Sequence, residues 1–278
     1  MVQSFRKVVV TGGSGKAGRA VVADLLEKGY DVLNVDIVPP VKRNSEFTQI
    51  DLTNLGHTVE ILRGADAVVH LAAIPAPGLA SDQKTFETNT LSTYIVFSAA
   101  AILKLKRVVS ASSETTLGLP FDDPFPHYAP IDEAHPLYPQ SSYALSKVVG
   151  EQMANHFSRW SGIPIVSLRF SNIMEPHDYE RFESWQNDPL VRKWNLWSYV
   201  DARDIAQSCR LAFEADVSGS PSYIIASADS VMRRTNADLM AEVFPGVPLK
   251  AGVGDHDTLL AVDKARQELG YNPGRWWR

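Results

Sequence analysis

Tyr143 and Lys147 stand four residues apart in the run YALSK, so a helix over this segment presents both side chains on one face. A tyrosine with its ordinary pKa of about 10 is a poor base at neutral pH. An ammonium close to the phenol stabilises the phenolate and lowers its pKa, which makes the tyrosine a usable proton shuttle. The same spacing also suits an exposed amphipathic helix, so the chemistry of this pair depends on its neighbours.

Three glycines, Gly12, Gly15 and Gly18, join a short β-branched run (Lys7–Thr11) to a helical pattern (Lys16–Lys28). Glycines let the backbone turn tightly and approach a pyrophosphate, which then lies at the positive N-terminus of the helix. A purely structural turn could carry the same glycines. The strand before them and the helix after them are the context of a dinucleotide-binding loop, which is therefore our prediction.

Asp36 ends the second predicted strand, 24 residues after Gly12. A carboxylate at this position can accept both ribose hydroxyls of an adenosine and repels a 2′-phosphate, which favours NAD over NADP. The alternative is a solvated aspartate at a strand end. Lys42 and Arg43 lie close enough in sequence to keep NADP open.

Short apolar runs alternate with helical patterns over the N-terminal two-thirds of the chain, and the pattern breaks into smaller pieces beyond Asn172. This alternation predicts an α/β fold, a Rossmann-type doubly wound parallel sheet with a small C-terminal α/β substrate cap. The NAD-binding core covers residues 1–172, with 197–227 returning to it, and the cap covers 173–196 and 228–278. The expected strands are Lys7–Thr11, Asp31–Asp36, Phe47–Asp51, Ala67–Leu71, one beginning at Arg107–Ser110, Ile165–Phe170 and Ser222–Ala226. The expected helices are Lys16–Lys28, His57–Arg63, Phe86–Leu103, Ser142–Trp160, Asp201–Glu214, Asn236–Val243 and Thr258–Leu269.

Composition argues against several classes of function. The 278 residues include 27 Lys and Arg against 32 Asp and Glu, a net charge of −5, whereas a duplex-binding surface needs a positive excess. We therefore expect no nucleic-acid partner. No apolar run approaches the roughly 18–20 residues that span a bilayer, and we see no cleavable leader, so we expect no membrane partner. The single cysteine, Cys209, excludes a disulfide scaffold and is typical of a reduced, cytoplasmic protein.

Taken in order, the motifs of this chain resemble those of the extended short-chain dehydrogenases/reductases, the NAD-dependent epimerase/dehydratase family. The resemblance covers roughly residues 5–215, and it is specific as a set although no single motif is. The matching segments are Thr11–Gly18, Asp36, Asp51-Leu52, His70–Ala73, Asn89, Ser110–Ser113 with Gly118, Ile131–Pro136 leading into Tyr143 and Lys147, Leu168–Asn172, and Tyr199–Asp201 with Asp204.

The resemblance implies a catalytic set of Ser113, Tyr143 and Lys147. The Ser113 hydroxyl would bond the substrate oxygen that Tyr143 protonates or deprotonates, Ser112 is the alternative one residue away, and Lys147 would also bond the nicotinamide ribose. The implied cofactor-binding residues of the loop are Gly12, Ser14, Gly15, Lys16, Ala17 and Gly18. Asp36 is implied at the ribose, Asp51 and Leu52 beside the adenine, and Leu71, Ala72 and Ala73 along the groove. Asn89, Tyr143 and Lys147 complete the implied set. Asn172 is implied to contact substrate or cofactor.

Three departures from the family pattern bear on the reaction. The 4,6-dehydratases that this chain resembles carry Thr-Asp-Glu where it has Ser-Glu-Thr at 113–115, which disfavours dehydration. Epimerases of UDP- or dTDP-sugars usually place a basic residue where Trp197 and Ser198 stand. The segment 172–199 is as short as in the uronate dehydrogenases, although Thr115 replaces a histidine expected in that subgroup.

These features favour an NAD-dependent oxidoreductase acting on a small sugar, sugar acid or polyol, with NADP as the less favoured cofactor. Arg181 lies in the short segment and could hold a substrate carboxylate through a fork of hydrogen bonds. The alternatives are a nucleotide-sugar 4-epimerase with tightly bound NAD and a non-catalytic NAD-sensing protein. The resemblance further implies a homodimer through the helices at 86–103 and 142–160.

No metal is expected. His127, His135 and His177 are the histidines that invite a metal site, but their spacing fits no compact ligand motif and no cysteine joins them.

Overall fold

A seven-stranded parallel sheet forms the centre of the molecule in the computed structural model, which describes residues 5–278. In the strand order β3-β2-β1-β4-β5-β6-β9, strands β2 and β3 are added on one side of β1, and β4 and the later strands on the other. The point between β1 and β4 is therefore the switch point of the predicted doubly wound topology. The strands are β1 (Lys7–Thr11), β2 (Asp31–Asp36), β3 (Glu46–Gln49), β4 (Ala67–His70), β5 (Arg107–Ser113), β6 (Ile165–Phe170) and β9 (Ser222–Ile225).

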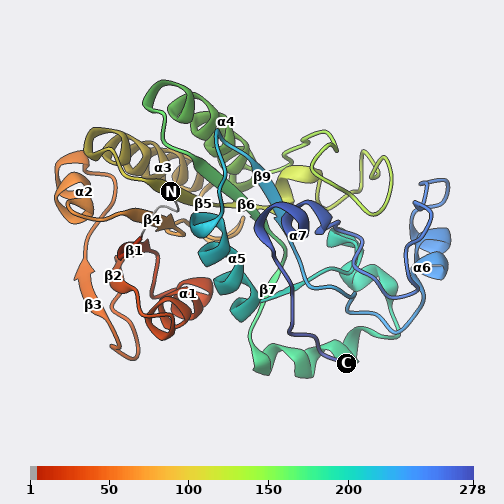
Figure 1. The fold of residues 1–278 in the computed structure, drawn as a ribbon. Coiled ribbons are helices and arrows are strands. Elements are labelled where there is room, and N and C mark those ends of the chain that lie inside the picture. Colours follow the sequence, from red (N-terminus) through yellow and green to blue (C-terminus); the bar gives the residue numbers. More distant parts are fainter. Residues whose placement is uncertain (1–4) are drawn as a thin grey trace.

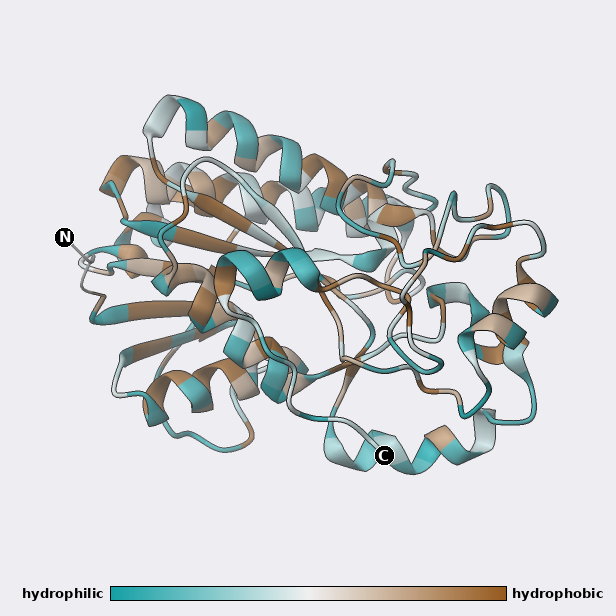
Figure 2. Ribbon diagram, turned by 45° about the vertical axis from the view of Figure 1, so that its right-hand side comes forward, coloured by the Kyte–Doolittle hydropathy of each residue, from teal (hydrophilic) through white to brown (hydrophobic). Residues whose placement is uncertain are grey.

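The central strands are apolar along their length because they are buried on both faces. Val9 pairs in register with Leu33 of β2 and with Val68 of β4, and all three side chains are buried. Continuous β-branched runs of this kind are typical of parallel sheets covered by helices. Figure 2 shows the apolar colour concentrated on the strands and the inner faces of the helices.

Helices cover both faces of the sheet (Figure 1). The helices α2 (Leu55–Leu62), α3 (Asp82–Leu103) and α4 (Ser142–Ser161) pack together on one face. The helices α1 (Lys16–Glu27) and α5 (Ala202–Glu214) pack together on the other, with α7 (Asp263–Leu269) beside β9. The predicted doubly wound parallel sheet, covered by helices on both faces, is thus confirmed.

Helices α1, α4 and α6 start where predicted, whereas α2 and α3 start earlier because side-chain caps set their first residues. The Ser81 hydroxyl accepts the Lys84 amide hydrogen and starts α3 four residues before the predicted start. Asn54 caps α2 in the same way. The predicted helix at 258–269 begins only at Asp263, because Leu260 is extended and bridges to Ile131.

The cap contains elements that the sequence pattern did not predict. Two-residue strands β7 (Ile173–Met174) and β8 (Val200–Asp201) pair, and they frame the 3-10 helices η2 (Pro176–Trp185) and η3 (Pro189–Asn195). Helix α6 (Asn236–Val243) matches its predicted bounds. One hydrophobic cluster joins the sheet to the cap, from Val10 through Trp197 to Leu239, so the cap shares its core with the sheet.

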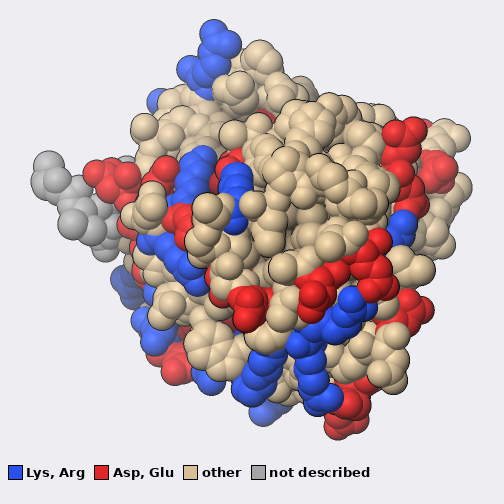
Figure 3. Space-filling model, turned by 90° about the vertical axis from the view of Figure 1, so that its right-hand side faces the viewer, with Lys and Arg blue, Asp and Glu red and all other residues tan. Residues whose placement is uncertain are grey.

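Charges are mixed over the cap end of the molecule. Figure 3 shows acidic and basic side chains interspersed there, with large uncharged areas between them. In the described part of the chain, residues 5–278, no helix has the length and apolar character that a bilayer crossing requires.

Candidate active site

The loop between β1 and α1 closes only with glycine at two of its positions. Gly12 has a φ of +72°, and a Cβ there would lie 2.6 Å from the Ala72 amide nitrogen. A Cβ on Gly18 would lie 2.1 Å from the Gly12 carbonyl oxygen. The turn, the loop after β4 and the first turn of α1 therefore touch through backbone atoms alone.

Gly15 differs from these two glycines. It is the N-cap of the 12-residue helix α1 and gives that helix no side-chain cap, and a Cβ there would meet only the Gly12 oxygen, at 3.3 Å. The Ser14 hydroxyl is buried without a hydrogen-bond partner. An uncapped helix N-terminus beside an unpartnered hydroxyl fits the pyrophosphate of a dinucleotide.

Asp36 fixes the loop from the neighbouring strand. Its Oδ2 accepts the Ser14 amide hydrogen at 3.0 Å, and its Oδ1 accepts that of Val38 at 3.2 Å. Lys16 donates to Asp178 at 2.7 Å, and Arg19 donates to Glu175 at 2.8 Å. These two cations in the first turn of α1 thus hold the start of η2 in the cap.

The segment after β4 runs against this loop. The Ala72 amide donates to the Thr11 hydroxyl at 3.4 Å, and Leu71 and Ala73 flank it in the chain. Asn89 on α3 bonds both backbone groups of Ile74, accepting at 2.8 Å and donating at 3.1 Å. Asn89 therefore positions the groove segment through its backbone.

Asp51 and Leu52 lie in different surroundings. Leu52 is buried in the core between β2 and α2, whereas Asp51 is exposed and accepts the Thr53 amide hydrogen at 2.9 Å. That hydrogen bond lowers the pKa of Asp51.

The structure brings Ser113, Tyr143 and Lys147 together at the carboxyl end of β5. The Ser113 hydroxyl is hydrogen-bonded to Tyr143 and accepts from the Thr115 hydroxyl at 3.0 Å. The Lys147 ammonium lies 5.6 Å from the centre of the Tyr143 ring and donates to the Ala111 carbonyl at 2.9 Å. Helix α4 begins at this point because the Ser141 hydroxyl caps the Ala144 amide at 3.0 Å.

The expectation that Lys147 lowers the pKa of Tyr143 is wrong for the protein by itself. Burial raises the pKa of Tyr143 to about 12, the bond from Ser113 opposes that rise, and the Glu114 charge adds to it. Burial also lowers the pKa of Lys147 to about 8. Burial is the largest cause of both shifts, and the ammonium donates its hydrogen bond to the Ala111 carbonyl.

Burial of the Lys147 ammonium should cost stability. We expect Lys147→Met to raise the free energy of unfolding at pH 7 by about 2 kcal/mol, after the lost hydrogen bond to Ala111 is deducted. The folded pKa of about 8 lies below the unfolded value of 10.5. The unfolded state therefore binds more protons between these pH values, and the penalty is full below pH 8 and vanishes above 10.5.

Urea unfolding of both proteins at pH 7 and pH 10 measures this effect, with exposed Lys28→Met as the control. A gap between wild type and Lys147→Met that does not shrink at pH 10 would contradict the argument.

Glu114 is a site residue that the sequence marked only as a departure from the dehydratase pattern. Its carboxylate accepts from Ser171 at 2.6 Å and from Asn195 at 3.3 Å, and it is buried. Burial raises its pKa to about 7. Its burial depends on contacts with η3, which no local pattern reveals.

The Asn172 side chain accepts from Arg192 at 2.9 Å. The Arg192 guanidinium is buried between the rings of Trp185 and Trp194, 4.6 Å and 4.8 Å from their centres. Arg181 is exposed, 5.6 Å from the centre of the Trp185 ring. Asn172 is thus tied to the cap through Arg192, whereas Arg181 is exposed to solvent.

Ser112, the alternative to Ser113, is engaged elsewhere, because its hydroxyl donates to Glu151 at 2.5 Å. His70 is buried and bonded to the Thr11 hydroxyl at 2.8 Å, and burial lowers its pKa to about 3, so it is a structural residue of the groove.

Among residues 5–278 the possible metal-ligand cluster is Glu175, His177 and Asp178, whose ligand atoms lie within 4.8 Å of one another. Arg19 and Lys16 already neutralise the two carboxylates, so this cluster carries no metal assignment.

The sequence profile of the NAD dependent epimerase/dehydratase family matches residues 8–226. The L-arabinose 1-dehydrogenase (NAD(P)(+)) of Haloferax volcanii is 28% identical, covering 77% of this chain and 85% of its own. The UDP-glucose 4-epimerase of Corynebacterium glutamicum is 24% identical, covering 96% of this chain and 91% of its own. A relative from Methanocaldococcus jannaschii is 30% identical but is matched over only 55% of its own length.

The fold is shared with solved structures. A short-chain dehydrogenase/reductase superfamily protein from Agrobacterium tumefaciens, crystallised with bound NAD, superposes with a TM-score of 0.74. It is 23% identical, and the match covers 98% of this chain and 94% of that one.

Proposed function

The chain belongs to the NAD-dependent epimerase/dehydratase family, and from this premise we propose that it is an NAD-dependent oxidoreductase. It transfers a hydride between the nicotinamide and a secondary alcohol or carbonyl carbon of a small sugar, sugar acid or polyol. The observation that carries the proposal is the convergence of Ser113, Tyr143 and Lys147 at the sheet edge that also bears the glycine loop.

In this mechanism Tyr143 moves the proton of the substrate hydroxyl. Bound NAD supplies the hydride acceptor. Ser113 bonds the reacting oxygen and holds the Tyr143 hydroxyl at the same point. Lys147, which donates to the Ala111 carbonyl and lies 5.6 Å from the centre of the Tyr143 ring, is the proposed partner of the nicotinamide ribose. The protein contributes alignment and the acid–base group.

The proposed cofactor is NAD because Asp36 places a carboxylate at the end of β2, beside the loop. The groove residues Leu71, Ala72 and Ala73 and the pair Asp51-Leu52 complete the proposed site. Saturation binding of NAD and NADP to the purified protein tests this choice, and tighter binding of NADP would overturn it.

The proposed substrate is small because the cap segment between Asn172 and Tyr199 is short and filled by its own aromatic side chains. A dehydrogenase of a free sugar is among the relatives matched over most of their length. Asn172 and Arg181 are the proposed substrate contacts. We place the reaction in the cytoplasm, since Cys209 is buried and needs no oxidising compartment.

The second candidate is a 4-epimerase that keeps NAD bound and returns the hydride, which the full-length alignment with the C. glutamicum enzyme favours. Absorbance at the NADH band distinguishes the dehydrogenase from the epimerase. A dehydrogenase forms NADH in excess over enzyme when sugars, uronates or polyols are screened with NAD. Protein that purifies with tight NAD and never accumulates NADH would identify the epimerase.

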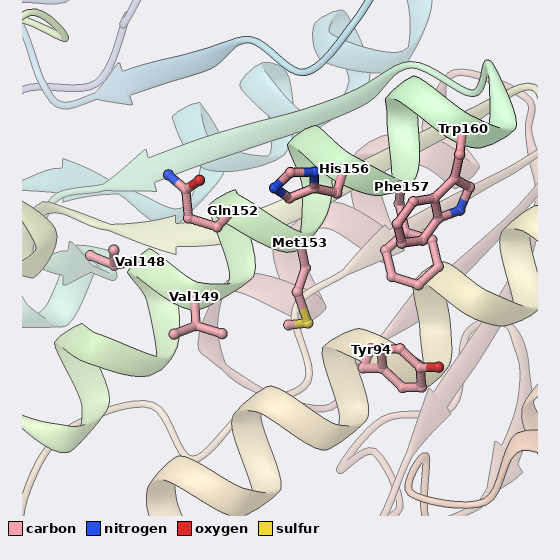
Figure 4. A pocket seen from close by; sticks show the side chains of 8 residues that line it. All are labelled: Tyr94, Val148, Val149, Gln152, Met153, His156, Phe157 and Trp160. Atoms are coloured by element: carbon pink, nitrogen blue, oxygen red, sulfur yellow. The ribbon is translucent and has the colours of Figure 1, made fainter.

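We further propose a homodimer through α3 and α4. Their outer faces carry an apolar depression of about 320 Å3, lined by Tyr94 from α3 and by Met153, Phe157 and Trp160 from α4 (Figure 4). Tyr94 is 48% exposed and Trp160 is 66% exposed. Exposed apolar patches of this kind mark protein–protein contacts.

Trp160→Asp should therefore convert the protein to a monomer, because a carboxylate on this face would be buried without a partner. Sedimentation equilibrium measures the change, and Leu190→Asp, at a 58% exposed leucine on η3, is the control that should remain dimeric. A wild-type protein that sediments as one chain, or a Trp160→Asp protein that stays dimeric, refutes this interface.

A further inference from the structure

A buried ion pair lies one helical turn beyond Lys147. The Glu151 carboxylate accepts from Arg169 of β6 at two points, Nε at 2.9 Å and a terminal nitrogen at 2.8 Å. The hydroxyl of Ser112 on β5 donates to the same carboxylate at 2.5 Å. The side chains of Arg169 and Glu151 are only 5% and 10% exposed. We name Ser112, Glu151 and Arg169 the Glu151 brace.

The brace and Lys147 tie the same helix to the same strand. Lys147 donates to the carbonyl of Ala111, and Glu151 accepts from the next residue, Ser112. Two contacts at successive turns of α4 on consecutive residues of β5 prevent the helix from sliding or rotating. The position of the ammonium therefore depends on the position of the carboxylate.

A small polar cavity separates the two charges. It has a volume of about 10 Å3, which is about the space of one water molecule, and Lys147 and Glu151 are the only charged side chains that line it. The remaining lining is largely hydroxyl groups, including Ser110, Ser146 and Ser167. Directional polar contacts thus help to hold the Lys147 end of α4.

Stability alone does not explain a charge pair here. Replacing a buried ion pair by apolar residues of similar volume is often neutral or stabilising, because two charges must be desolvated. What the pair adds is geometry, since the planar guanidinium and the carboxylate meet in one fixed orientation.

We propose that Glu151 is a positioning residue for hydride transfer, and that its fork on Arg169 and its bond to Ser112 fix the Lys147 ammonium on the Ala111 carbonyl. The inference rests on the proposed function, because it assigns a role to Lys147 in that reaction. Misplacing a catalytic group by about 1 Å can cost about 100-fold in rate.

The test is a double-mutant cycle between Glu151→Gln and Lys147→Met, measured as kcat in the NAD-loaded enzyme with the sugar found by the screen. We expect Glu151→Gln to lower kcat by about 100-fold and to have almost no further effect once Lys147 is replaced. The matched control is Asp24→Asn, which breaks the Arg210–Asp24 pair between α1 and α5, also 2.8 Å long and partly buried. It should leave kcat unchanged.

An equal loss of kcat in the Lys147→Met background, or an equal loss in Asp24→Asn, would overturn the proposal. If Glu151→Gln unfolds because Arg169 is left unpaired, the variant with Glu151→Gln and Arg169→Gln together removes both charges and replaces it in the cycle. If the proposed function itself is wrong, the wild-type protein transfers no hydride, and this result is distinct from either outcome above.

In that case NMR of protein labelled with 15N-lysine decides the positioning role without any activity. Burial lowers the pKa of Lys147, so its titration midpoint should rise in Glu151→Gln as the ammonium leaves its desolvated position. Loss of the carboxylate charge by itself would lower the midpoint, so an unchanged or lower midpoint would refute the inference.

Discussion

Replacing Tyr143 by phenylalanine is expected to lower kcat by about 10²–10⁴-fold, the usual contribution of a positioned acid–base group. The substitution removes one hydroxyl from a side chain that is only 9% exposed, so the ring still fills its place between α4 and β5. NAD binding should change little, because the glycine loop and Asp36 are untouched. Stopped-flow measurement of NADH formation, with NAD titrated by fluorescence, checks both parts.

The control for this prediction is Tyr223→Phe. That tyrosine lies on β9, an outer strand of the sheet, and is also buried. Its hydroxyl donates to Glu268 at 2.7 Å. It should keep wild-type kcat. If Tyr143→Phe turns over as fast as the wild type, Tyr143 is not the proton-transferring group, and the assignment of the Ser–Tyr–Lys set is rejected.

The substitution Gly18→Ala should damage the fold and the cofactor site together. Its Cβ would lie 2.1 Å from the Gly12 oxygen and 2.5 Å from the Gly13 Cα, both backbone atoms that cannot turn aside. Overpacking of this kind costs about 1–3 kcal/mol or more, and we expect the upper end of that range. We also expect NAD binding to be lost, because the loop must move away from α1.

Gly15→Ala separates the two effects. Its Cβ meets one atom at 3.3 Å and its φ of −73° suits alanine, so stability should stay close to wild type. NAD should nevertheless bind more weakly, because a methyl group then stands at the helix terminus proposed for the pyrophosphate. Urea unfolding and NAD titration of both variants measure this, and a Gly18→Ala protein as stable as Gly15→Ala would disprove the packing argument.

Local chemistry in the sequence predicted the elements of the sheet well. Strands β1, β2 and β6 have the predicted bounds, since continuous β-branched runs and the glycines that end helices act over a few residues. The start of α3 was predicted four residues too late because a single cap, Ser81, outweighs the apolar period. The paired strands β7 and β8 were missed because two residues show no period at all.

The candidate site was predictable only in part. The glycine loop and the pair Tyr143 and Lys147 are readable because their spacing is itself the signal. The position of Ser112 against Glu151, the burial of Glu114, and the stacking of Arg192 between two indoles depend on residues far away in the chain. The C-terminal Trp277 is another case, since its ring nitrogen donates to Ser230 and fastens the tail to the cap.

The strands of the main sheet, the helices that alternate with them, and the residue types that could bind a dinucleotide and move a proton all follow from local sequence patterns. The tertiary structure decided the electrostatics. Burial raises the pKa of Tyr143 and lowers that of Lys147, whose ammonium donates to the backbone carbonyl of Ala111. Desolvation is a property of everything that surrounds a group, and spacing along the chain carries no record of it.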